Sequence, residues 1–505
     1  MKQPYFDIIV IGGGINGAGI ARDAQGRGLS VYLCEKDDLA SATSSASSKL
    51  IHGGLRYLEY YEFSLVRKAL KEREVLLAMA PHIIWPLRFI LPHNQHQRPA
   101  WLIRLGLFLY DHLAKRKVLS GSKQVNLHKH TAGNPLQDKH KIAFAYSDCW
   151  VQDARLTVLN AVDAQNRGAT IETRTECLKA QRVNDLWEVT VRDTETGQEK
   201  VLLSKAIVNA TGPWVASLMD EKKIAVENTK QLRLVKGSHI VTKKLFDHNY
   251  CYIFQNDDGR IVFAIPYESD YTLIGTTEVD YQDDPGKATP NDAEKAYLCE
   301  VSNDYFQTSI TPQDIIWSYA GVRPLFDDAV DDASAATRDY VFDIQDVDGK
   351  APILSIFGGK ITTFRRLAES AVEQLSAYFD HPAKNWTATA PLPGGDLDGL
   401  SFDAFVEAKQ SQYSWASPKM IYRLCREYGS CIDSLLAGCS SVSELGEHFG
   451  HNFYEAEANY LATYEFAKTA DDILWRRSKL GLHLTIQERE RFRSMFEKEL
   501  AKSEQ

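Results

Sequence analysis

The stretch Asp7-Ile-Ile-Val-Ile-Gly12-Gly13-Gly14-Ile-Asn-Gly17 decides the fold of this chain. Four consecutive apolar residues, Ile8 to Ile11, predict a strand buried on both faces, and a helical stretch from Ala18 to Arg27 follows the glycines. In the spacing Gly12-x-Gly14-x-x-Gly17, the first glycine permits a tight turn and the second lets the backbone approach a pyrophosphate. The third lets the helix pack on the strand. The amides at the N-terminus of this helix then point to the phosphates.

A second predicted strand, Ser30 to Cys34, ends at Glu35, where an acidic side chain is expected to bind ribose hydroxyls. A glycine triplet alone also fits a turn in another type of βα unit. Here the strand, the glycines, the helix, the second strand and its terminal acid all agree. They favour a dinucleotide-binding unit over the simpler interpretation.

Composition sets the size and the class of the molecule. At 505 residues the chain is too long for a single core, so we expect two or three domains. Its net charge of −9 argues against nucleic acid as a partner, and its eight cysteines lack metal-ligand spacing, so we expect reduced cytosolic thiols and no metal site. A secretory leader and a membrane-spanning helix are not expected, since no basic-then-apolar start and no run of 18 apolar residues occur.

A hydroxyl-rich segment follows the second strand, from Leu39 to Tyr57. Its small side chains can lie close against a ligand, although a flexible serine-rich linker is the alternative. Lys49, His52 and Arg56 interrupt the segment, and Phe63 to Met79 then reads as an amphipathic helix. We therefore expect the segment to be ordered and to face the ligand.

Two further strands end in glycines. One delivers Ala210-Thr-Gly212, and the other, Ile353 to Phe357, delivers Gly358-Gly359-Lys360 and then a helix from Arg365 to Ala377. Three such elements predict a large cofactor held at several points, which suits a flavin better than a nicotinamide. The last helix and Lys360 would stabilise the negative charge of a reduced flavin ring.

Residues 231 to 282 read as antiparallel strands that form a separate sheet, whereas residues 319 to 325 and 337 to 339 read as loops. Residues 98–117 combine apolar residues at helical spacing with flanking lysines and arginines. This segment fits a helix lying in a membrane surface as well as it fits a core helix with a basic end.

These motifs together resemble the FAD-dependent sn-glycerol-3-phosphate dehydrogenases, and the resemblance covers essentially the whole chain. It looks closest to the bacterial aerobic, membrane-associated type. The stretches that carry it are residues 12–35, Ser44 to Tyr57, Ala210-Thr-Gly-Pro-Trp214, Lys236-Gly-Ser-His239, Gly321-Val-Arg323-Pro and Phe357-Gly-Gly-Lys360.

The resemblance implies an α/β fold with three parts. A glutathione-reductase-like FAD-binding Rossmann domain would be formed by residues 1–85, 146–225 and 318–390. Residues 86–145 and 226–317 would form an antiparallel, β-rich substrate cap, and residues 391–505 an all-helical C-terminal domain. From the sequence, that last domain could serve as a scaffold, a dimer contact or a surface on the quinone side.

The resemblance also implies oxidation of sn-glycerol 3-phosphate at C2 to dihydroxyacetone phosphate. FAD would take the hydride, and a membrane quinone such as ubiquinone would re-oxidise it. The protein would then be cytoplasmic, attached peripherally to the cytoplasmic face of the inner membrane, with a homodimer as one open assembly.

The candidate site residues fall into three groups. For the phosphate and the rest of the substrate, we expect Arg56, Arg323 and Arg338 as cationic donors, with Tyr57, His239 and Lys360 beside them. The catalytic candidates are His52, favoured as the base, His239, which orients the substrate or shares that role, and Lys360. The predicted FAD-binding residues are Gly12, Gly14, Gly17, Glu35, Ser44, Ser45, Ser48, Lys49, Ala210, Gly212, Gly359, Lys360 and Thr362.

Three alternatives stay open at this point. A glycerol-3-phosphate oxidase would pass electrons to oxygen and release peroxide. An amine or amino-acid oxidase of the same fold would need one cation for a carboxylate instead of an arginine cluster. A non-catalytic, flavin- or nucleotide-binding membrane adaptor would hold a flavin that substrate does not bleach.

Overall fold

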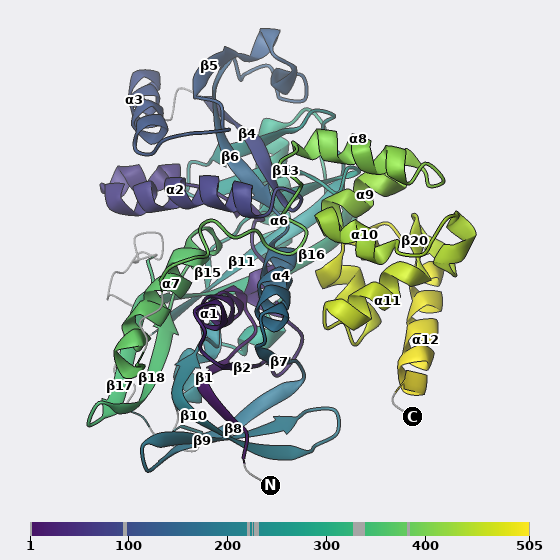
Figure 1. Cartoon of the computed structure of the whole chain (residues 1–505). Coiled ribbons are helices and arrows are strands. Elements are labelled where there is room, and N and C mark those ends of the chain that lie inside the picture. The colour runs from purple at the N-terminus through teal and green to yellow at the C-terminus, as the bar shows by residue number, and fades with distance from the viewer. Residues whose placement is uncertain are drawn as a thin grey trace.

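The structure, a computed structural model, describes residues 3–93, 98–219, 223–224, 226, 232–326, 339–380 and 384–503. It contains two large sheets, one above the other in Figure 1, and a helical C-terminal domain beside them. We call the first the parallel sheet and the second the cap sheet. The cavity described below lies where the two sheets meet.

The parallel sheet is built around the opening strand. In spatial order its strands are β17 (Val341–Val347), β18 (Lys350–Phe357), β10 (Glu199–Asn209), β1 (Tyr5–Ile11), β2 (Val31–Cys34) and β7 (Thr170–Glu172). Pairing is parallel from β18 to β7, and β17 joins antiparallel to β18. Ile8 and Val10 pack on one face and Ile9 and Ile11 on the other, as expected for a strand buried on both sides.

Three helices cover one face of the parallel sheet: α1 (Ile15–Gly26), α4 (Asp153–Asn166) and α7 (Phe364–Leu375). Helix α1 starts three residues earlier than predicted, so its first amides follow Gly14 directly. The opposite face is covered in part by a hairpin of β8 (Thr175–Val183) and β9 (Leu186–Asp193), which pairs with β10.

The cap sheet has ten strands and is almost entirely antiparallel, as the sequence predicted. Its order is β15 (Val279–Asp280), β11 (Leu232–Lys243), β14 (Tyr271–Gly275), β13 (Ile261–Tyr267), β12 (Tyr250–Gln255), β4 (Ile84–His93), β6 (Ile142–Val151) and β3 (Leu50–Ile51). In addition, β16 (Ile315–Phe326) pairs with β11, and β5 (Lys123–Asn126) pairs with β6. Helix α6 (Asp292–Tyr305) contributes to the core on one face of the sheet.

Two predicted boundaries of the cap are wrong. Residues 319–325 are not a loop of the nucleotide-binding domain, because they form part of β16 and pair with β11 along its length. The stretch contains Pro324, which an edge strand tolerates because the missing amide can face away from the neighbouring strand. Strand β6 also crosses the predicted boundary at residue 146 and pairs with β4 throughout.

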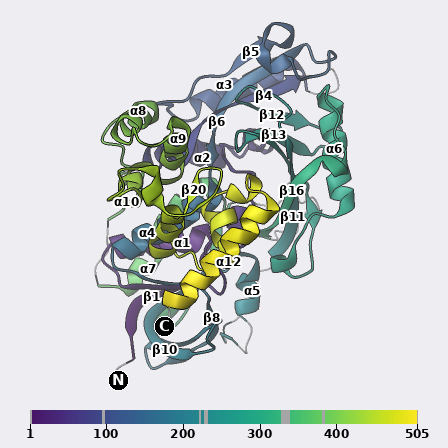
Figure 2. The same cartoon turned by 90° about the vertical axis from the view of Figure 1, so that its right-hand side faces the viewer.

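The C-terminal domain has a hydrophobic core of its own and lies alongside α4 (Figures 1 and 2). Its helices are α8 (Phe402–Gln412), α9 (Pro418–Tyr428), α10 (Ile432–Leu435), α11 (Glu455–Tyr464) and α12 (Ile486–Ser503). The domain is helical as predicted, apart from a short hairpin of β19 (His448–Gly450) and β20 (Phe453–Tyr454). One turn of π-helix, Asp472–Arg477, faces the rest of the molecule.

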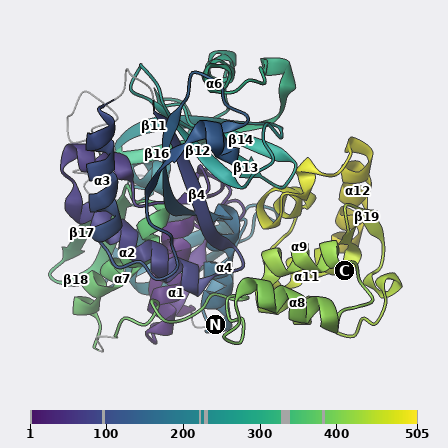
Figure 3. The ribbon, with the colours of Figure 1, turned by 90° about the horizontal axis from the view of Figure 1, so that it is seen from above.

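Two helices flank the cap sheet on the side away from the C-terminal domain (Figure 3). Helix α2 (Phe63–Met79) has the bounds that the sequence predicted, whereas α3 (Ala100–His112) covers only part of segment 98–117. No helix among the described residues is long and apolar enough to cross a membrane.

A buried ion pair joins α2 to α7. The Arg365 guanidinium donates two hydrogen bonds of 2.7 Å to the Glu72 carboxylate, and both side chains are almost inaccessible to water. The same guanidinium also pairs with the buried Glu369 carboxylate on α7. Glu72→Gln should therefore lower the free energy of unfolding by roughly 1.5–3 kcal/mol, because it weakens two hydrogen bonds to a charged group while Glu369 still balances the buried charge. Chemical denaturation measures this, with the exposed Lys350–Asp185 pair as control: Lys350→Ala should leave the midpoint unchanged. An equal effect of the two substitutions on the unfolding midpoint would contradict a stabilising role of the buried pair between Glu72 and Arg365.

Candidate active site

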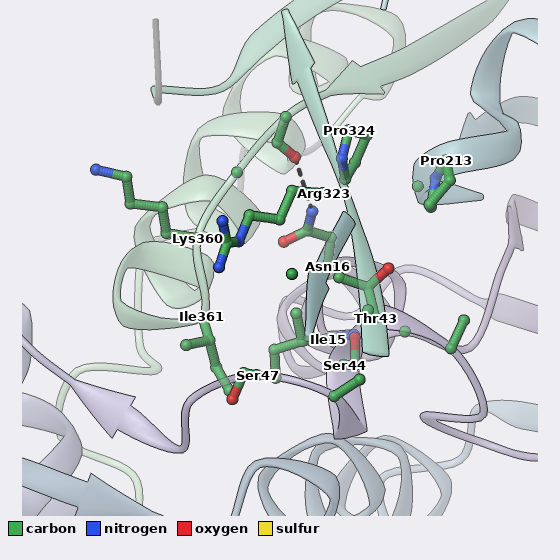
Figure 4. Close-up of a pocket in the computed structure, with 18 of the residues that line it drawn as sticks. Ile15, Asn16, Thr43, Ser44, Ser47, Pro213, Arg323, Pro324, Lys360 and Ile361 are labelled. Atoms are coloured by element: carbon green, nitrogen blue, oxygen red, sulfur yellow. Dashed lines mark hydrogen bonds between the residues drawn. The ribbon is translucent and has the colours of Figure 1, made fainter. Parts of the chain in front are cut away.

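A cavity of about 470 Å³ lies between the carboxyl ends of the parallel strands and the cap sheet (Figure 4). Its floor is made by the ends of β1, β2, β10 and β18 and by residues of the hydroxyl-rich segment. Its roof includes Phe89, Tyr146, Ile253 and Phe263 from the cap strands. An open α/β sheet binds ligands at this edge of its strands.

The first glycine turn is closely packed. Gly12 has a φ of +110°, and a Cβ there would lie 2.6 Å from the Ala210 carbonyl oxygen. A Cβ at Gly17 would lie 1.9 Å from the Gly12 oxygen, so Gly17 serves helix packing and does not line the cavity. Gly14 is different, because the atom nearest to a Cβ there would be the Ser44 hydroxyl oxygen, at 3.1 Å. Gly14 also lines the cavity on its open side.

Glu35 lies at the end of β2, where the sequence placed it. Its carboxylate accepts hydrogen bonds from the amides of Gly13 at 2.7 Å and Asp37 at 2.9 Å. Burial raises the pKa of Glu35 above its ordinary value, although these two amide hydrogen bonds oppose that effect. The carboxylate therefore ties the first turn to the loop after β2 and lines the cavity.

The second and third glycine turns reach the same cavity. Ala210 and Gly212 line it at the end of β10, and Gly358 and Gly359 at the end of β18 have φ values of +80° and +100°. Asn16 links the first and third turns, because its amide donates to the Gly358 oxygen at 3.4 Å (Figure 4).

Of the hydroxyl-rich segment, Ser44 and Ser48 line the cavity, and so does Thr362 beside α7. Ser44 accepts a hydrogen bond from the Ile15 amide at 2.9 Å, so it caps the first turn of α1. Lys49 and Ser45 do not line the cavity. Lys49 is buried beneath the segment, where its ammonium donates to the Asp153 carboxylate at 2.7 Å and to the Ser45 carbonyl at 3.0 Å.

The predicted role of Lys49 and Ser45 in binding the cofactor is therefore not supported by their positions. A buried ammonium needs a counter-ion, and Asp153, distant in sequence, provides it. The same carboxylate accepts from the hydroxyl of Ser47 at 2.7 Å, so this ion pair fixes the segment from below.

Four predicted substrate residues do meet at the cavity: Arg56, Tyr57, Arg323 and Lys360. The Arg323 guanidinium lies 3.2 Å from both the Glu278 carboxylate and the Thr276 hydroxyl. The Lys360 ammonium lies 3.8 Å from the centre of the Tyr57 ring, and Figure 4 shows its side chain running away from Arg323. Arg338 lies outside the described residues.

The two candidate histidines occupy different layers. His52 lines the cavity, and its backbone amide donates to the Thr362 hydroxyl at 3.3 Å. His239 is buried behind Ser48, with 2.9 Å between its Nε2 and the serine hydroxyl, and it stacks on Tyr319 at 4.8 Å. Burial and the nearby Arg323 and Lys49 cations lower the pKa of His239 well below its ordinary value, so its ring is neutral at pH 7.

Several cavity residues had no specific signal in the sequence. Asn16 lies between Gly14 and Gly17, so its place in the glycine motif could have indicated that it lines the cavity. Arg260, Thr276 and Glu278 come from cap strands or turns that only the folded sheet brings to the site. Among the described residues, no group of three or more histidine, cysteine, aspartate or glutamate side chains is arranged to bind a metal ion.

The cavity suits a long cofactor with a pyrophosphate in its middle. It runs from Glu35 and Glu176 past the Gly14 turn to Gly359 and Thr362, with the first residues of α1 and the turn before α7 on its wall. Glycines at the turns leave room for close approach of a ligand, and helix amides favour negative charge. These residues fit FAD, whose ring would lie towards the third turn.

The fold and this site define a flavin-dependent oxidoreductase. Residues 7–363 match the family described as FAD dependent oxidoreductase, and residues 385–502 match the C-terminal domain of alpha-glycerophosphate oxidase. The chain belongs to the FAD-dependent glycerol-3-phosphate dehydrogenase family, as the curated relatives show. The resemblance, the fold class and the FAD cofactor inferred from the sequence are thereby confirmed.

Three relatives are similar over nearly their whole length. The glycerol-3-phosphate dehydrogenase of Pseudomonas aeruginosa is 51% identical, covering 95% of this chain and 93% of its own. The aerobic glycerol-3-phosphate dehydrogenase of Escherichia coli is 50% identical, covering 96% of each. The D-erythritol 1-phosphate dehydrogenase of Brucella abortus is also 50% identical, covering 97% of each.

Solved structures agree on the fold. The glycerol-3-phosphate dehydrogenase from Bacillus halodurans, solved with FAD, superposes with a TM-score of 0.77 at 27% identity and covers 98% of this chain and 94% of its own. The FAD-bound L-alpha-glycerophosphate oxidase from Mycoplasma pneumoniae gives a TM-score of 0.60 at 19% identity, covering 78% of this chain and all of its own.

Gly14→Val should abolish retention of FAD, because its side chain would occupy the open side of the first turn, where the pyrophosphate is expected. The flavin absorbance of the purified protein relative to its absorbance at 280 nm measures this. Gly106→Ala is the control, since a Cβ at Gly106 on α3 has no neighbour within 4 Å. Full flavin content in Gly14→Val would refute this location of the pyrophosphate.

Proposed function

We propose that this enzyme oxidises sn-glycerol 3-phosphate at C2 to dihydroxyacetone phosphate. The observation that carries the proposal is the meeting of two arginines, Arg56 and Arg323, with His52 in one cavity that also fits the flavin. Arginine binds a phosphomonoester with its planar fork, whereas the carboxylate of an amino acid needs a single cation. The names of the relatives from Pseudomonas aeruginosa and Escherichia coli support the same substrate.

The residues of the chain then have separate roles in binding the substrate and in transferring its proton. Arg323 and Arg56 hold the phosphate, and Arg323 exchanges part of its interaction with Glu278 for the substrate. His52 accepts the proton of the C2 hydroxyl on its ring, and neutral His239 keeps Ser48 in place at the cavity wall. Bound FAD supplies the hydride acceptor. Lys360 follows the third turn and lines the cavity, where its ammonium would stabilise the negative charge of the reduced flavin ring.

A second candidate substrate is D-erythritol 1-phosphate, the four-carbon substrate in the name of the relative from Brucella abortus. The deciding experiment adds each polyol phosphate anaerobically to the yellow protein and follows bleaching of the flavin band. We expect glycerol 3-phosphate to bleach it with the higher kcat/KM. Faster reduction by D-erythritol 1-phosphate would replace the proposed substrate, and faster reduction by glycine or proline would refute a phosphate site.

For the electron acceptor we propose a membrane quinone such as ubiquinone, in place of oxygen. A soluble quinone analogue should support anaerobic turnover, and air-saturated buffer should yield no peroxide. Stoichiometric peroxide formation would instead identify an oxidase.

Helix α3 supports this choice, because it presents apolar side chains outward. Leu107 and Tyr110 face the core, whereas Trp101, Leu105 and Phe108 on the same helix are exposed, Trp101 by 68%. Tyr61, at the end of the short helix that contacts α3, is 80% exposed. One face of the helix therefore packs on the core, and the opposite face presents apolar side chains to the surroundings.

We therefore propose that the outer face of α3 lies in a membrane surface, at the cytoplasmic face of the inner membrane. Apolar residues rimmed by cations such as Arg98, Arg104 and Lys115 suit an interface with anionic lipid headgroups. A quinone dissolved in that bilayer would then reach the enzyme on the same side.

Arg323→Ala should raise KM for glycerol 3-phosphate roughly 100-fold with flavin content unchanged, because hydrogen bonds to charged groups contribute roughly 1.5–3 kcal/mol. Steady-state kinetics with an artificial dye measure this. Arg491→Ala, an exposed arginine of α12, is the control and should keep the parental KM. An unchanged KM in Arg323→Ala would remove this residue from the phosphate site.

The pair Leu105→Asp and Phe108→Asp should release the enzyme from anionic vesicles while sparing dye-coupled activity, because each apolar side chain contributes roughly 1.5–3 kcal/mol on burial. Co-sedimentation with vesicles measures this. The control is the pair Tyr464→Asp and Ile486→Asp, two exposed residues of the C-terminal domain. Figure 3 shows that this domain lies on the side of the molecule away from α3. Persistent sedimentation of the α3 variant would refute the proposed membrane surface.

A further inference from the structure

A buried cluster of charged side chains joins the C-terminal domain to the loop after β2. Asp38 stands three residues after Glu35 in that loop. The Arg477 guanidinium donates to one oxygen of Asp38 at 2.8 Å and to the other through its second terminal nitrogen, and Arg476 donates to the same carboxylate. Arg477 has no exposed surface and Asp38 has almost none.

Two more charges complete the cluster. Arg174, just after β7, donates to both oxygens of Asp472 at 2.8 Å and approaches Asp38 to 3.4 Å. Burial alone would raise the pKa of Asp472, but the guanidiniums of Arg476, Arg174 and Arg477 outweigh it and hold that pKa well below its usual range. The carboxylate of Asp472 is therefore ionised among the three arginines, and losing either aspartate would leave buried positive charge uncompensated.

The same loop is a wall of the cofactor cavity. The Thr175 amide donates to the Glu35 carbonyl at 2.8 Å, and the Ala40 amide donates to the Gly13 carbonyl at 3.2 Å. Between these two anchors, the Asp38 side chain turns away from the cavity and into the charged cluster. The loop residues that line the cavity are Glu35, Lys36, Asp37, Ala40, Ser41 and Ala42.

We propose that the C-terminal domain positions the FAD-binding loop 35–42, with Arg476 and Arg477 holding Asp38 as a clamp. Asp38 is a positioning residue, since it acts through the loop and does not face the cofactor. A loop that is already ordered loses less conformational entropy when a ligand binds. The clamp therefore makes FAD binding tighter and its release slower, which gives the C-terminal domain a role that the sequence left open.

The holoenzyme itself tests the clamp. Purified Asp38→Asn is diluted, and the release of FAD is followed by the rise of free-flavin fluorescence. We expect a dissociation constant at least tenfold above that of the parent. The matched control is Glu457→Gln, which breaks the Arg423–Glu457 pair, a buried ion pair with N–O distances of 2.7 Å that lies wholly within the C-terminal domain. This control should keep the parental affinity for FAD.

Two further measurements cover the case in which Asp38→Asn does not fold. Arg476→Gln removes one clamp residue that is partly exposed, and it should also weaken FAD binding. Hydrogen exchange should be faster in the peptide that spans residues 35–42, in this variant and in Asp38→Asn. Parental FAD affinity in a folded clamp variant would overturn the proposal, as would an equal loss of FAD in Glu457→Gln.

Discussion

The contact between Gly12 and the Ala210 carbonyl is the constraint on which the rest of the site depends. It brings the first turn against the end of β10, where any side chain at position 12 would collide with backbone. Because β18 pairs with β10 on the other side, the third turn follows within reach, and Asn16 bridges to Gly358. Three turns that are distant in sequence thus form one continuous wall of the cavity.

The cap completes the site because its strands return to this wall. Strand β16 crosses the cap beside β11 and carries Arg323 to the cavity, while β3 and the turn after it carry His52 and Arg56 from below. The charged groups around the cavity are held by partners: Lys49 by Asp153, and Arg323 by Glu278 and Thr276. A site that places several cations near a flavin needs this support, because unpaired charges there would be costly.

The sequence predicted those parts of the site whose signals are local. Each strand, glycine turn and helix occupies a single short stretch, so the sequence alone indicates that Gly14, Ala210 and Gly359 follow strands in glycine turns. The position of Lys49 depends on its counter-ion Asp153, about a hundred residues away in the sequence. Residues 319–325 form a strand and not a loop because they pair with β11, about 80 residues earlier. The roof of the cavity and the clamp at Asp38 follow from tertiary packing alone and left no pattern to read.

The most direct test of this account is a crystal structure of the holoenzyme with dihydroxyacetone phosphate bound. We expect an extended FAD with its pyrophosphate against residues 12–15 and its flavin ring beside Gly359. The phosphate of the ligand should contact the guanidiniums of Arg56 and Arg323. A ligand phosphate bound elsewhere, with both guanidiniums turned to solvent, would contradict the account.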